Sequence, residues 1–394
     1  MKKIGLLMID SLPMPPIKGG AVENLTQSII EHNEVAGDFE FHVFSVYAEG
    51  VSNATKKTYY HYYNPQGPLL LWEFVIRVVR YVFRHYFNTY LSSYYEIQAK
   101  RLFKHLGIAT VVLENCPYSA ICLNKNSEFQ IIQHLHNDYL HEHNNLIDQL
   151  LSRSQKILAV SQFIKSRIAP IVPKRIPIDV CYNGIDLSRY DSKATEDELS
   201  ALRQKYGIGK SDKVIIYVGR LVVNKGVKEL IQAFKAVSSQ YEDWKLLIVG
   251  GLSFSDNFRD SYVDELYSIA SEMGDRVVIT GYIDSWELPK YYQLASLSAV
   301  PSICFESFSL STLEAMASGV PAIVSDAGGM LEVVDDKCSS IVKRGETFVD
   351  DLAKAMDNVM SDENQLNRMA SFAKERAKKF SAEAMYASFK KSLL

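Results

Sequence analysis

Two carboxylates, Glu306 and Glu314, are separated by seven residues in the segment ESFSLSTLEAMASG, which begins at Glu306. Apolar runs, SLSAVPSICF and VPAIVSD, lie on either side. Ser311 or Thr312 is expected to cap a helix, with Glu314 in its first turn, where the helix dipole favours a carboxylate. Glu306 precedes that helix, at the carboxyl end of a predicted strand. A carboxylate there is placed to accept hydrogen bonds from the hydroxyl groups of a ligand.

Two other segments carry groups suited to phosphate. Gly19 and Gly20, in IKGGAVENL, lie between a predicted strand and a predicted helix. Glycines let the backbone approach a ligand, and a helix start offers free N–H groups, although a plain tight turn would also explain the pair. Arg220 and Lys225, in YVGRLVVNKG, follow another predicted strand and could neutralise a diphosphate. A solvated basic loop is the alternative for these two cations.

Histidines gather in the first half of the chain, where all nine lie before residue 144. Strand alternation in QHLHND puts His134 and His136 on one face. Together with His141 and His143 they could form a metal cluster. No cysteine is near them in the sequence, and no DxD-like pair occurs at a suitable place. The expectation is therefore that no metal is bound.

The composition is that of an ordinary globular protein: 394 residues, 47% of them apolar and 23% charged, which suits two domains. A net charge of −3 gives no case for nucleic acid as a partner. Residues 1–182 carry 18 Lys/Arg and 15 Asp/Glu, whereas the remainder is net negative. The five cysteines form no CxxC pair, which favours a reduced, cytoplasmic setting. No run is apolar enough to span a bilayer, and Asp10 ends the first run too early for a secretory signal.

Short apolar runs alternate with helical patterns, which predicts parallel α/β sheets whose ligands bind beyond the carboxyl ends of the strands. The alternation begins again after VCYNGIDLSRY, so two units of similar size are expected. Strands are predicted at 3–10, 39–46, 109–115, 129–136 and 156–161, and then at 213–219, 245–251, 276–282, 297–302 and 321–326. Helices are predicted at about 22–33, 227–241, 262–273, 310–319 and 381–394.

The stretch from Leu69 to Leu106 mixes large apolar and aromatic residues with arginines and lysines and has few acids. Arg77, Arg80 and Arg84 follow the spacing of one helical face. A basic, aromatic-rich amphipathic helix suits an anionic membrane surface, so residues 71–90 are predicted to contact the inner leaflet. A core helix with an exposed basic face is the alternative.

Several motifs together resemble the retaining, nucleotide-sugar-dependent glycosyltransferases of family four (glycosyl transferases group 1). They are IKGGAVENL, HLHNDY, VSQFIK, YNGIDLSRY, YVGRLVVNKG, LLIVGG and ESFSLSTLEAMASGVPAIVSDAGGMLEVV, in family order over nearly the whole chain. The resemblance implies the GT-B fold, in which two Rossmann-like domains face each other across a cleft. It implies an acceptor-binding domain at 1–182, a nucleotide-sugar-binding domain at 183–375, and a helix within 376–394 that crosses back to the first domain.

The resemblance also implies a role for each candidate residue. Glu306 would bind hydroxyls of the donor sugar, Glu314 the ribose, and His136 would lie near the sugar. The diphosphate would be met by Arg220, Lys225, the Gly19–Gly20 loop and the backbone N–H groups of Ser309 and Leu310. The loop after LLIVGG and the stretch GYIDSW would hold the base. The family often has Gly where this chain has Ser309.

The activity implied is transfer of a sugar, with retained anomeric configuration and without a metal or other cofactor, from a nucleotide diphosphate sugar. A UDP-sugar is favoured by family frequency, and the acceptor would be a cell-surface glycan or a lipid-linked saccharide. A cytoplasmic enzyme peripheral to the membrane is expected. Two alternatives remain open: a sugar-nucleotide epimerase or phosphorylase of the same fold, and a catalytically silent partner subunit. The second predicts loss of the Arg/Lys/Glu set, which is present in full.

Overall fold

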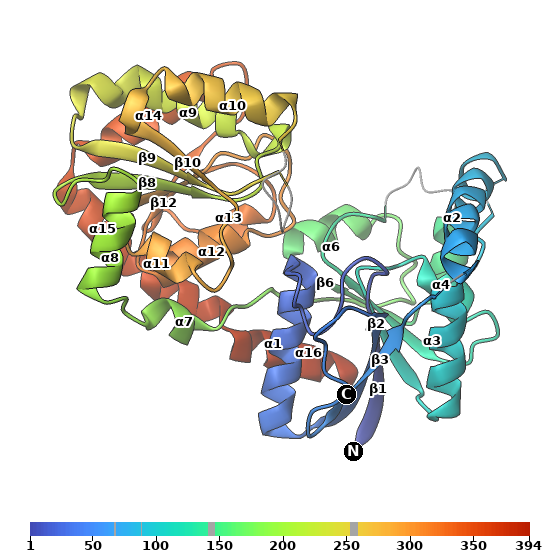
Figure 1. The fold of residues 1–394 in the computed structure, drawn as a ribbon. Helices are drawn as coiled ribbons and strands as arrows, with labels where there is room; N and C mark the ends of the chain where they lie inside the picture. The colour runs from blue at the N-terminus through green and yellow to red at the C-terminus, as the bar shows by residue number, and fades with distance from the viewer. Residues whose placement is uncertain (67, 88, 141–145, 253–258) are drawn as a thin grey trace. The chain divides into compact units, whose positions relative to one another are not determined.

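The computed structural model of the chain describes residues 1–66, 68–87, 89–140, 146–252 and 259–394 (Figure 1). The chain divides into two compact units. The first comprises Met1–Asn183 together with Ala382–Leu394, and the second comprises Gly184–Ser381. Each unit holds one parallel sheet, so the predicted pair of parallel α/β domains is confirmed.

The first unit has a seven-stranded sheet in the order β3-β2-β1-β4-β5-β6-β7. Its strands are β1 (Lys2–Leu7), β2 (Phe39–Val46), β3 (Thr58–Tyr63), β4 (Thr110–Glu114), β5 (Gln130–Leu135), β6 (Lys156–Ala159) and β7 (Ile178–Val180). Strands β1, β4 and β5 are almost continuously buried, as expected for strands covered on both faces. The strand order reverses between β1 and β4, which marks the carboxyl ends of these two strands as the place for a ligand.

The helices of this unit include α1 (Ala21–Ala36), α4 (Ser119–Leu123), α5 (Ile147–Leu151), α6 (Gln162–Ile168) and α16 (Ala382–Leu393). Helix α16 packs on α1, so residues distant in the sequence share one core (Figure 1). The Tyr386 hydroxyl donates to Asp38 at 2.8 Å, and the Lys390 ammonium lies 2.6 Å from the same carboxylate. Phe389 is fully buried against the ring of Phe41.

The basic aromatic stretch forms two helices rather than one, α2 (Pro68–Phe87) and α3 (Tyr94–His105). The second helix begins at a capping box, in which Ser93 Oγ accepts from the backbone N–H of Glu96 and the Glu96 carboxylate accepts from the backbone N–H of Ser93. The membrane prediction for 71–90 therefore concerns α2 and the segment after it. No helix of the described chain is both long and apolar enough to cross a bilayer.

The second unit has a six-stranded sheet in the order β10-β9-β8-β11-β12-β13. Its strands are β8 (Lys213–Val218), β9 (Trp244–Val249), β10 (Val277–Gly281), β11 (Leu297–Val300), β12 (Ala322–Ser325) and β13 (Ser339–Val342). Its helices are α7 (Leu187–Asp191), α8 (Glu196–Lys205), α9 (Val227–Val237), α10 (Ser261–Ser271), α11 (Leu288–Tyr292), α12 (Leu310–Ala317), α13 (Met330–Val333), α14 (Phe348–Met360) and α15 (Glu363–Ala377). The strand order reverses between β8 and β11, next to the predicted cations and Glu306.

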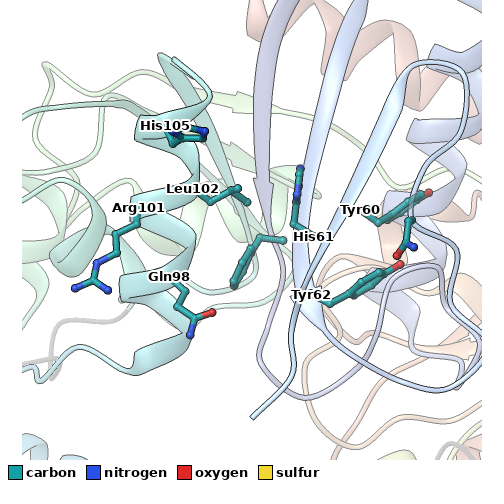
Figure 2. A pocket seen from close by; sticks show the side chains of 9 residues that line it. Tyr60, His61, Tyr62, Gln98, Arg101, Leu102 and His105 are labelled. Carbon is teal, nitrogen blue, oxygen red and sulfur yellow. The ribbon is translucent and has the colours of Figure 1, made fainter. Parts of the chain in front are cut away.

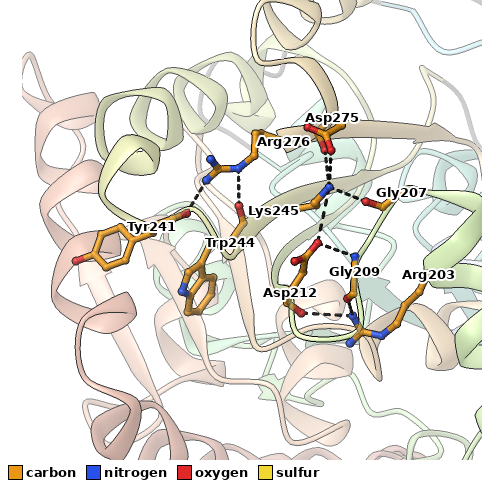
Figure 3. A network of polar contacts seen from close by, with 9 residues as sticks. All are labelled: Arg203, Gly207, Gly209, Asp212, Tyr241, Trp244, Lys245, Asp275 and Arg276. Carbon is orange, nitrogen blue, oxygen red and sulfur yellow. Dashed lines mark hydrogen bonds and ion pairs between the residues drawn. The ribbon is translucent and has the colours of Figure 1, made fainter.

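The opposite, amino-terminal edge of this sheet is held by paired charges (Figure 3). Lys245 is buried near the start of β9, and its ammonium donates to Asp275 Oδ2 at 2.8 Å and to the carbonyl oxygen of Gly207 at 2.6 Å. Arg276 donates to the carbonyl oxygens of Trp244 and Tyr241 at 2.9 and 2.6 Å. These side chains satisfy one another and nearby carbonyls, which fits a structural role.

Candidate active site

The loop after β8 carries the two predicted cations, Arg220 and Lys225, and packs closely against the loop after β11. A short 3-10 turn spans Val223–Lys225 and ends at Gly226, whose φ is +70°. A Cβ at Gly226 would lie 2.0 Å from the carbonyl oxygen of Pro301, so only glycine allows this approach. Arg220 is exposed at the start of the loop, where its carbonyl oxygen accepts a 2.9 Å bond from the buried Tyr217 hydroxyl.

Glu306 lies in the loop after β11 and is the ion-pair partner of Lys225. The Lys225 ammonium donates to Glu306 Oε1 at 2.6 Å, and the Ser302 hydroxyl donates to the same oxygen at 2.5 Å. The backbone of Glu306 is tied to the segment after β12, since its carbonyl oxygen accepts from the N–H of Gly329 at 2.8 Å. The structure therefore fixes the carboxylate from both its side chain and its main chain, at the carboxyl edge of the sheet.

Helix α12 begins at Leu310, and its N-cap is Ser309 rather than the predicted Ser311 or Thr312. The Ser309 hydroxyl accepts from the backbone N–H of Thr312 at 3.4 Å and pairs with the Thr312 hydroxyl at 2.7 Å. Ser309 has an extended backbone with φ −137°, so serine fits here without strain. The first turn retains backbone N–H groups without intrahelical partners, which suits an anion.

Glu314 lies in the second turn of α12, so the prediction that it sits in the first turn is wrong. The Tyr292 hydroxyl donates to Glu314 Oε2 at 3.0 Å, and Tyr190 supplies a second hydroxyl bond. Burial raises the pKa of the Glu314 carboxyl, although both tyrosine bonds and the charge of Arg189 act to lower it. This half-buried carboxylate is held by tyrosines of α7 and α11, which sequence reasoning missed.

A cavity of about 260 Å³ lies beyond the carboxyl ends of β8, β9 and β10. It is lined by Leu221, Gly250, Gly251, Arg259, Val263, Tyr267, Thr280 and Gly281. The Arg259 guanidinium carbon lies 3.6 Å from the centre of the Tyr267 ring. This cavity begins where the base was predicted, directly after LLIVGG, while residues 253–258 of that loop lie outside the described part of the chain.

In the first unit, Gly19 and Gly20 lie in the turn between β1 and α1, with φ angles of +73° and +104°. A Cβ at Gly20 would lie 2.1 Å from Glu23 Oε2, a carboxylate buried in the first turn of α1. The second glycine is therefore required by the backbone conformation and by the close approach of Glu23. The turn opens α1 at the same sheet edge as the carboxyl end of β4.

His136 directly follows β5 and shares a buried cluster with His134 and Glu114. Glu114 Oε2 lies 2.8 Å from His134 Nδ1 and 3.3 Å from His136 Nε2. The prediction that the two histidines share a face is confirmed, because both reach this carboxylate. Glu114, His134 and His136 have the donor types of a metal site, with ligand atoms within 4.8 Å of one another. His141 and His143, the other members of the alternative cluster, lie outside the described residues.

A second cavity, of about 670 Å³, lies between α3 and the edge strand β3 (Figure 2). Gln98, Arg101 and His105 project from α3, and His61 and Tyr62 belong to β3. Burial and the neighbouring His42 lower the pKa of His61 to about 4. No candidate residue from the sequence analysis lies in this groove.

Sequence comparisons connect the chain to proteins of one class. Residues 200–376 match the profile of the family described as glycosyl transferases group 1. The Bacillus subtilis protein YtcC is 26% identical over 381 residues, which cover 95% of this chain and 87% of that protein. The D-inositol 3-phosphate glycosyltransferase of Nocardia farcinica is 32% identical over 224 residues, covering 55% of this chain and 48% of that protein.

Structural comparison extends the similarity to both units. The Anabaena protein HepE, in its complex with UDP-glucose, is similar with a TM-score of 0.76 and 20% identity, covering all of this chain and 99% of that protein. At this level of identity the likeness shows the fold alone, which is GT-B, as the motifs implied.

Proposed function

We propose that this chain, which belongs to the glycosyl transferases group 1 family and has the GT-B fold, transfers a sugar from a nucleotide diphosphate sugar with retention of configuration. The observation that carries the proposal is the Lys225–Glu306 pair, 2.6 Å apart, at the sheet edge where α12 also begins. Lys225, the cation that would bind phosphate, and Glu306, the carboxylate that would bind sugar hydroxyls, thus lie in adjoining loops of one domain.

Each residue has a task in the proposed reaction. Arg220, Lys225 and the N–H groups at Ser309 and Leu310 stabilise the departing diphosphate. Glu306 accepts hydrogen bonds from donor-sugar hydroxyls. The acceptor oxygen bonds to the anomeric carbon on the face that the diphosphate leaves, the bond to the diphosphate oxygen breaks with its electron pair, and the acceptor proton passes to that oxygen. These cations and N–H groups supply charge stabilisation that a metal supplies elsewhere, so we propose metal-independent transfer.

We further propose UDP as the nucleotide, which HepE in complex with UDP-glucose supports by analogy. Glu314 binds the ribose hydroxyls in this proposal, and the cavity lined by Gly250 and Gly281 receives the base. The Gly19–Gly20 turn, with its positive φ angles, leads directly into α1, and the N–H groups of the first turn of α1 would meet a phosphate in this proposal.

The acceptor in this proposal is a saccharide or lipid-linked saccharide, and the enzyme works at the cytoplasmic face of a membrane through α2. Trp72, Val75, Val79, Phe83 and Tyr86 are all exposed and fall within one stripe of this helix. An amphipathic helix normally buries such a stripe. Exposed Trp and Tyr beside aliphatic residues suit the interface of a bilayer, and three arginines against one glutamate in α2 favour anionic lipid.

The arginines of α2 do not all contribute to that surface. Arg80 points inward, with its guanidinium 3.1 Å from the Tyr90 hydroxyl and 3.7 Å from the Glu96 carboxylate at the start of α3. The side chains of Arg77 and Arg84 lie outside the described part. Because Arg80 is engaged by Tyr90 and Glu96, the proposed attachment rests mainly on the exposed apolar stripe.

A donor screen tests the proposed activity. The full chain is incubated with UDP-, GDP-, ADP- and dTDP-sugars, and thermal stabilisation and release of the free nucleotide are measured. The expected result is stabilisation and slow hydrolysis with one nucleotide class, followed by transfer to a saccharide acceptor whose new linkage keeps the donor's anomeric configuration by NMR. Failure of every nucleotide sugar to bind would refute the proposal, and an inverted linkage would refute retention.

A further inference from the structure

Glu114, His134 and His136 meet because β4 and β5 are neighbouring parallel strands. Glu114 is paired directly with His134 in their register, and His136 follows two residues later on the same face. One carboxylate oxygen of Glu114, Oε2, accepts hydrogen bonds from both imidazole rings. All three side chains are at least nine-tenths buried. The cluster lies beside the β1–β4 reversal of the sheet, where a ligand is expected.

Asn115, the next residue, holds the same segment through its main chain and side chain. Its backbone N–H donates to the His134 carbonyl oxygen at 2.9 Å, and its Oδ1 accepts from the backbone N–H of His136 at 3.2 Å. Asn115 has a φ of +56°, one of two positive values among the described non-glycine residues. Such a conformation persists where its surroundings fix it, and it is common at functional sites.

The hydrogen bonds assign the protons of the cluster. An ionised carboxylate only accepts, so His134 presents N–H from Nδ1 and His136 presents N–H from Nε2. Burial alone would raise the pKa of Glu114, but the charge of His134 and the bonds from both histidines lower it to about 2. Burial alone would lower the pKa of His134, but Glu114 and Cys181 raise it to about 10. Burial and the His134 charge lower the pKa of His136, against the opposing pull of Glu114.

At neutral pH the cluster therefore holds one anion, one cation and one neutral imidazole. With its proton on Nε2, His136 has a lone pair on Nδ1, and no residue of the described structure donates to that nitrogen. A buried acceptor without a donor is costly, which makes Nδ1 a place for a ligand hydroxyl.

We infer that Glu114 is a positioning residue, which holds the His136 ring in one orientation with its proton on Nε2 so that Nδ1 accepts a hydrogen bond from a hydroxyl of the transferred sugar. The inference rests on the proposed function only in naming a sugar as the ligand. His134 supplies the buried positive charge that keeps Glu114 ionised. A carboxylate that fixes an imidazole tautomer is a known way of setting which nitrogen meets the ligand.

Other titratable groups around the cluster also bear on its pH dependence. Glu23 of α1 and Cys116 after β4 interact electrostatically with Glu114, and Cys181 after β7 interacts electrostatically with His134. The ring of Phe389 from α16 packs on His134 at 5.8 Å between centroids. These groups are unchanged in the variants below, so a change in behaviour reports on the cluster itself.

The first test is long-range ¹H–¹⁵N NMR of the ligand-free full chain labelled at histidine, with His136 assigned by its loss in His136→Asn. The wild type should show His136 protonated at Nε2 and bare at Nδ1 between pH 6 and 8. Glu114→Gln should give mixed tautomers. Glu96→Gln is the matched control, because Glu96 is an equally buried carboxylate of the same unit that bonds Ser93 and Ser119. A wild-type His136 protonated at Nδ1 would overturn the inference.

The second test is kinetic. Glu114→Gln should lower kcat by about tenfold with KM for the donor changed less than twofold, because one hydrogen bond to the reacting sugar loses its orientation. His134→Asn removes the cation, so the pKa of His136 should rise and kcat/KM should fall several-fold more between pH 8 and pH 6 than in the wild type. Unchanged pH profiles and kcat would refute a positioning role. If no transferase activity is found, the proposed function fails, while the NMR result still decides the tautomer.

Discussion

The Lys225 ammonium and the Glu306 carboxylate lie 2.6 Å apart and join the loop after β8 to the loop after β11. Each side chain neutralises the charge of the other. In a bound nucleotide sugar, the phosphate oxygens would accept hydrogen bonds from the lysine ammonium. The sugar hydroxyl groups would donate hydrogen bonds to the carboxylate. We therefore expect the two members of this ion pair to take different partners when a nucleotide sugar binds.

Glu306→Gln should reduce turnover more than donor affinity. The amide keeps the size of the side chain but loses the negative charge that helps most as positive charge develops at the anomeric carbon. We expect kcat to fall by about 10²–10³ with KM for the donor within about threefold. Steady-state kinetics with the donor found by screening would measure this. Lys225→Met is the companion variant, expected to weaken binding of free UDP; a Glu306→Gln enzyme with wild-type kcat would contradict the assignment.

Glu314→Gln should stabilise the protein at neutral pH and weaken nucleotide binding. Burial raises the pKa of Glu314 in the fold, so the stability linked to its protonated form is present at low pH and is lost as pH rises through that raised value. The neutral amide avoids this loss. We expect a Tm increase of a few degrees at pH 7.5 that vanishes near pH 4, since 1 kcal/mol moves Tm by about 2–4 °C in a domain of this size.

Calorimetric titration of the same variant with UDP supplies the second measurement. A carboxylate that receives two ribose hydroxyls acts in the ground state and the transition state alike, so Glu314→Gln should lower UDP affinity by about tenfold and raise KM. Tyr190→Phe provides a control, because it removes one neighbouring hydroxyl and keeps the carboxylate. Equal UDP affinity in the wild type and Glu314→Gln would rule out the ribose assignment.

Sugar transfer should continue after treatment with EDTA. Arg220, Lys225 and the start of α12 supply the positive charge that the leaving diphosphate needs, so no ion is required in the proposal. Activity assays with chelator, and again with added Mg²⁺, Mn²⁺ or Zn²⁺, would check this. Complete loss with chelator and recovery with one metal would point instead to the Glu114, His134 and His136 cluster as a metal site.

Vesicle co-sedimentation should find the chain bound to anionic bilayers at low salt. Replacing Trp72, Phe83 and Tyr86 by serine should release it, because these exposed rings form the apolar stripe of α2. Arg80→Gln is the contrasting variant, expected to lower thermal stability more than vesicle binding because Arg80 faces Tyr90 and Glu96. A wild type that stays in the supernatant with anionic vesicles at low salt would exclude the membrane role.

Much of the fold could be predicted from the sequence, because buried parallel strands are short continuous apolar runs and ten of them were found that way. Strand β3, with the sequence TYYHYY, was missed since its tyrosines and histidine give no apolar run. Strand β7, with the sequence IDV, has only three residues, and β13, with the sequence SSIV, begins with two serines, so neither gives an apolar run. The cap of α12 was misplaced because Ser309, Ser311 and Thr312 are all suitable, and only the backbone decides among them.

The candidate site residues could be predicted where they follow a recognisable strand. The contacts between them could not be predicted, because these contacts depend on the order of the strands in the sheet. Glu306 and Lys225 were selected from the loops that follow strands, but their ion pair spans 81 positions and depends on the neighbouring order of β8 and β11. Glu114 was missed for the same reason. Glu114 contacts His134 because the two residues are opposite each other in the register of β4 and β5. The two apolar runs alone do not reveal that these strands are neighbours.

Helix α16 belongs to the first unit, although it is translated after the whole of the second. The two segments of the first unit are therefore synthesised at different times, before and after the second unit. Phe389 can pack on the His134 ring only after residues 382–394 have been synthesised. Until then the nascent first domain exposes the apolar surface of α1 and Phe41 that this helix covers. The packing around the histidine cluster therefore depends on a segment that is made after the second unit.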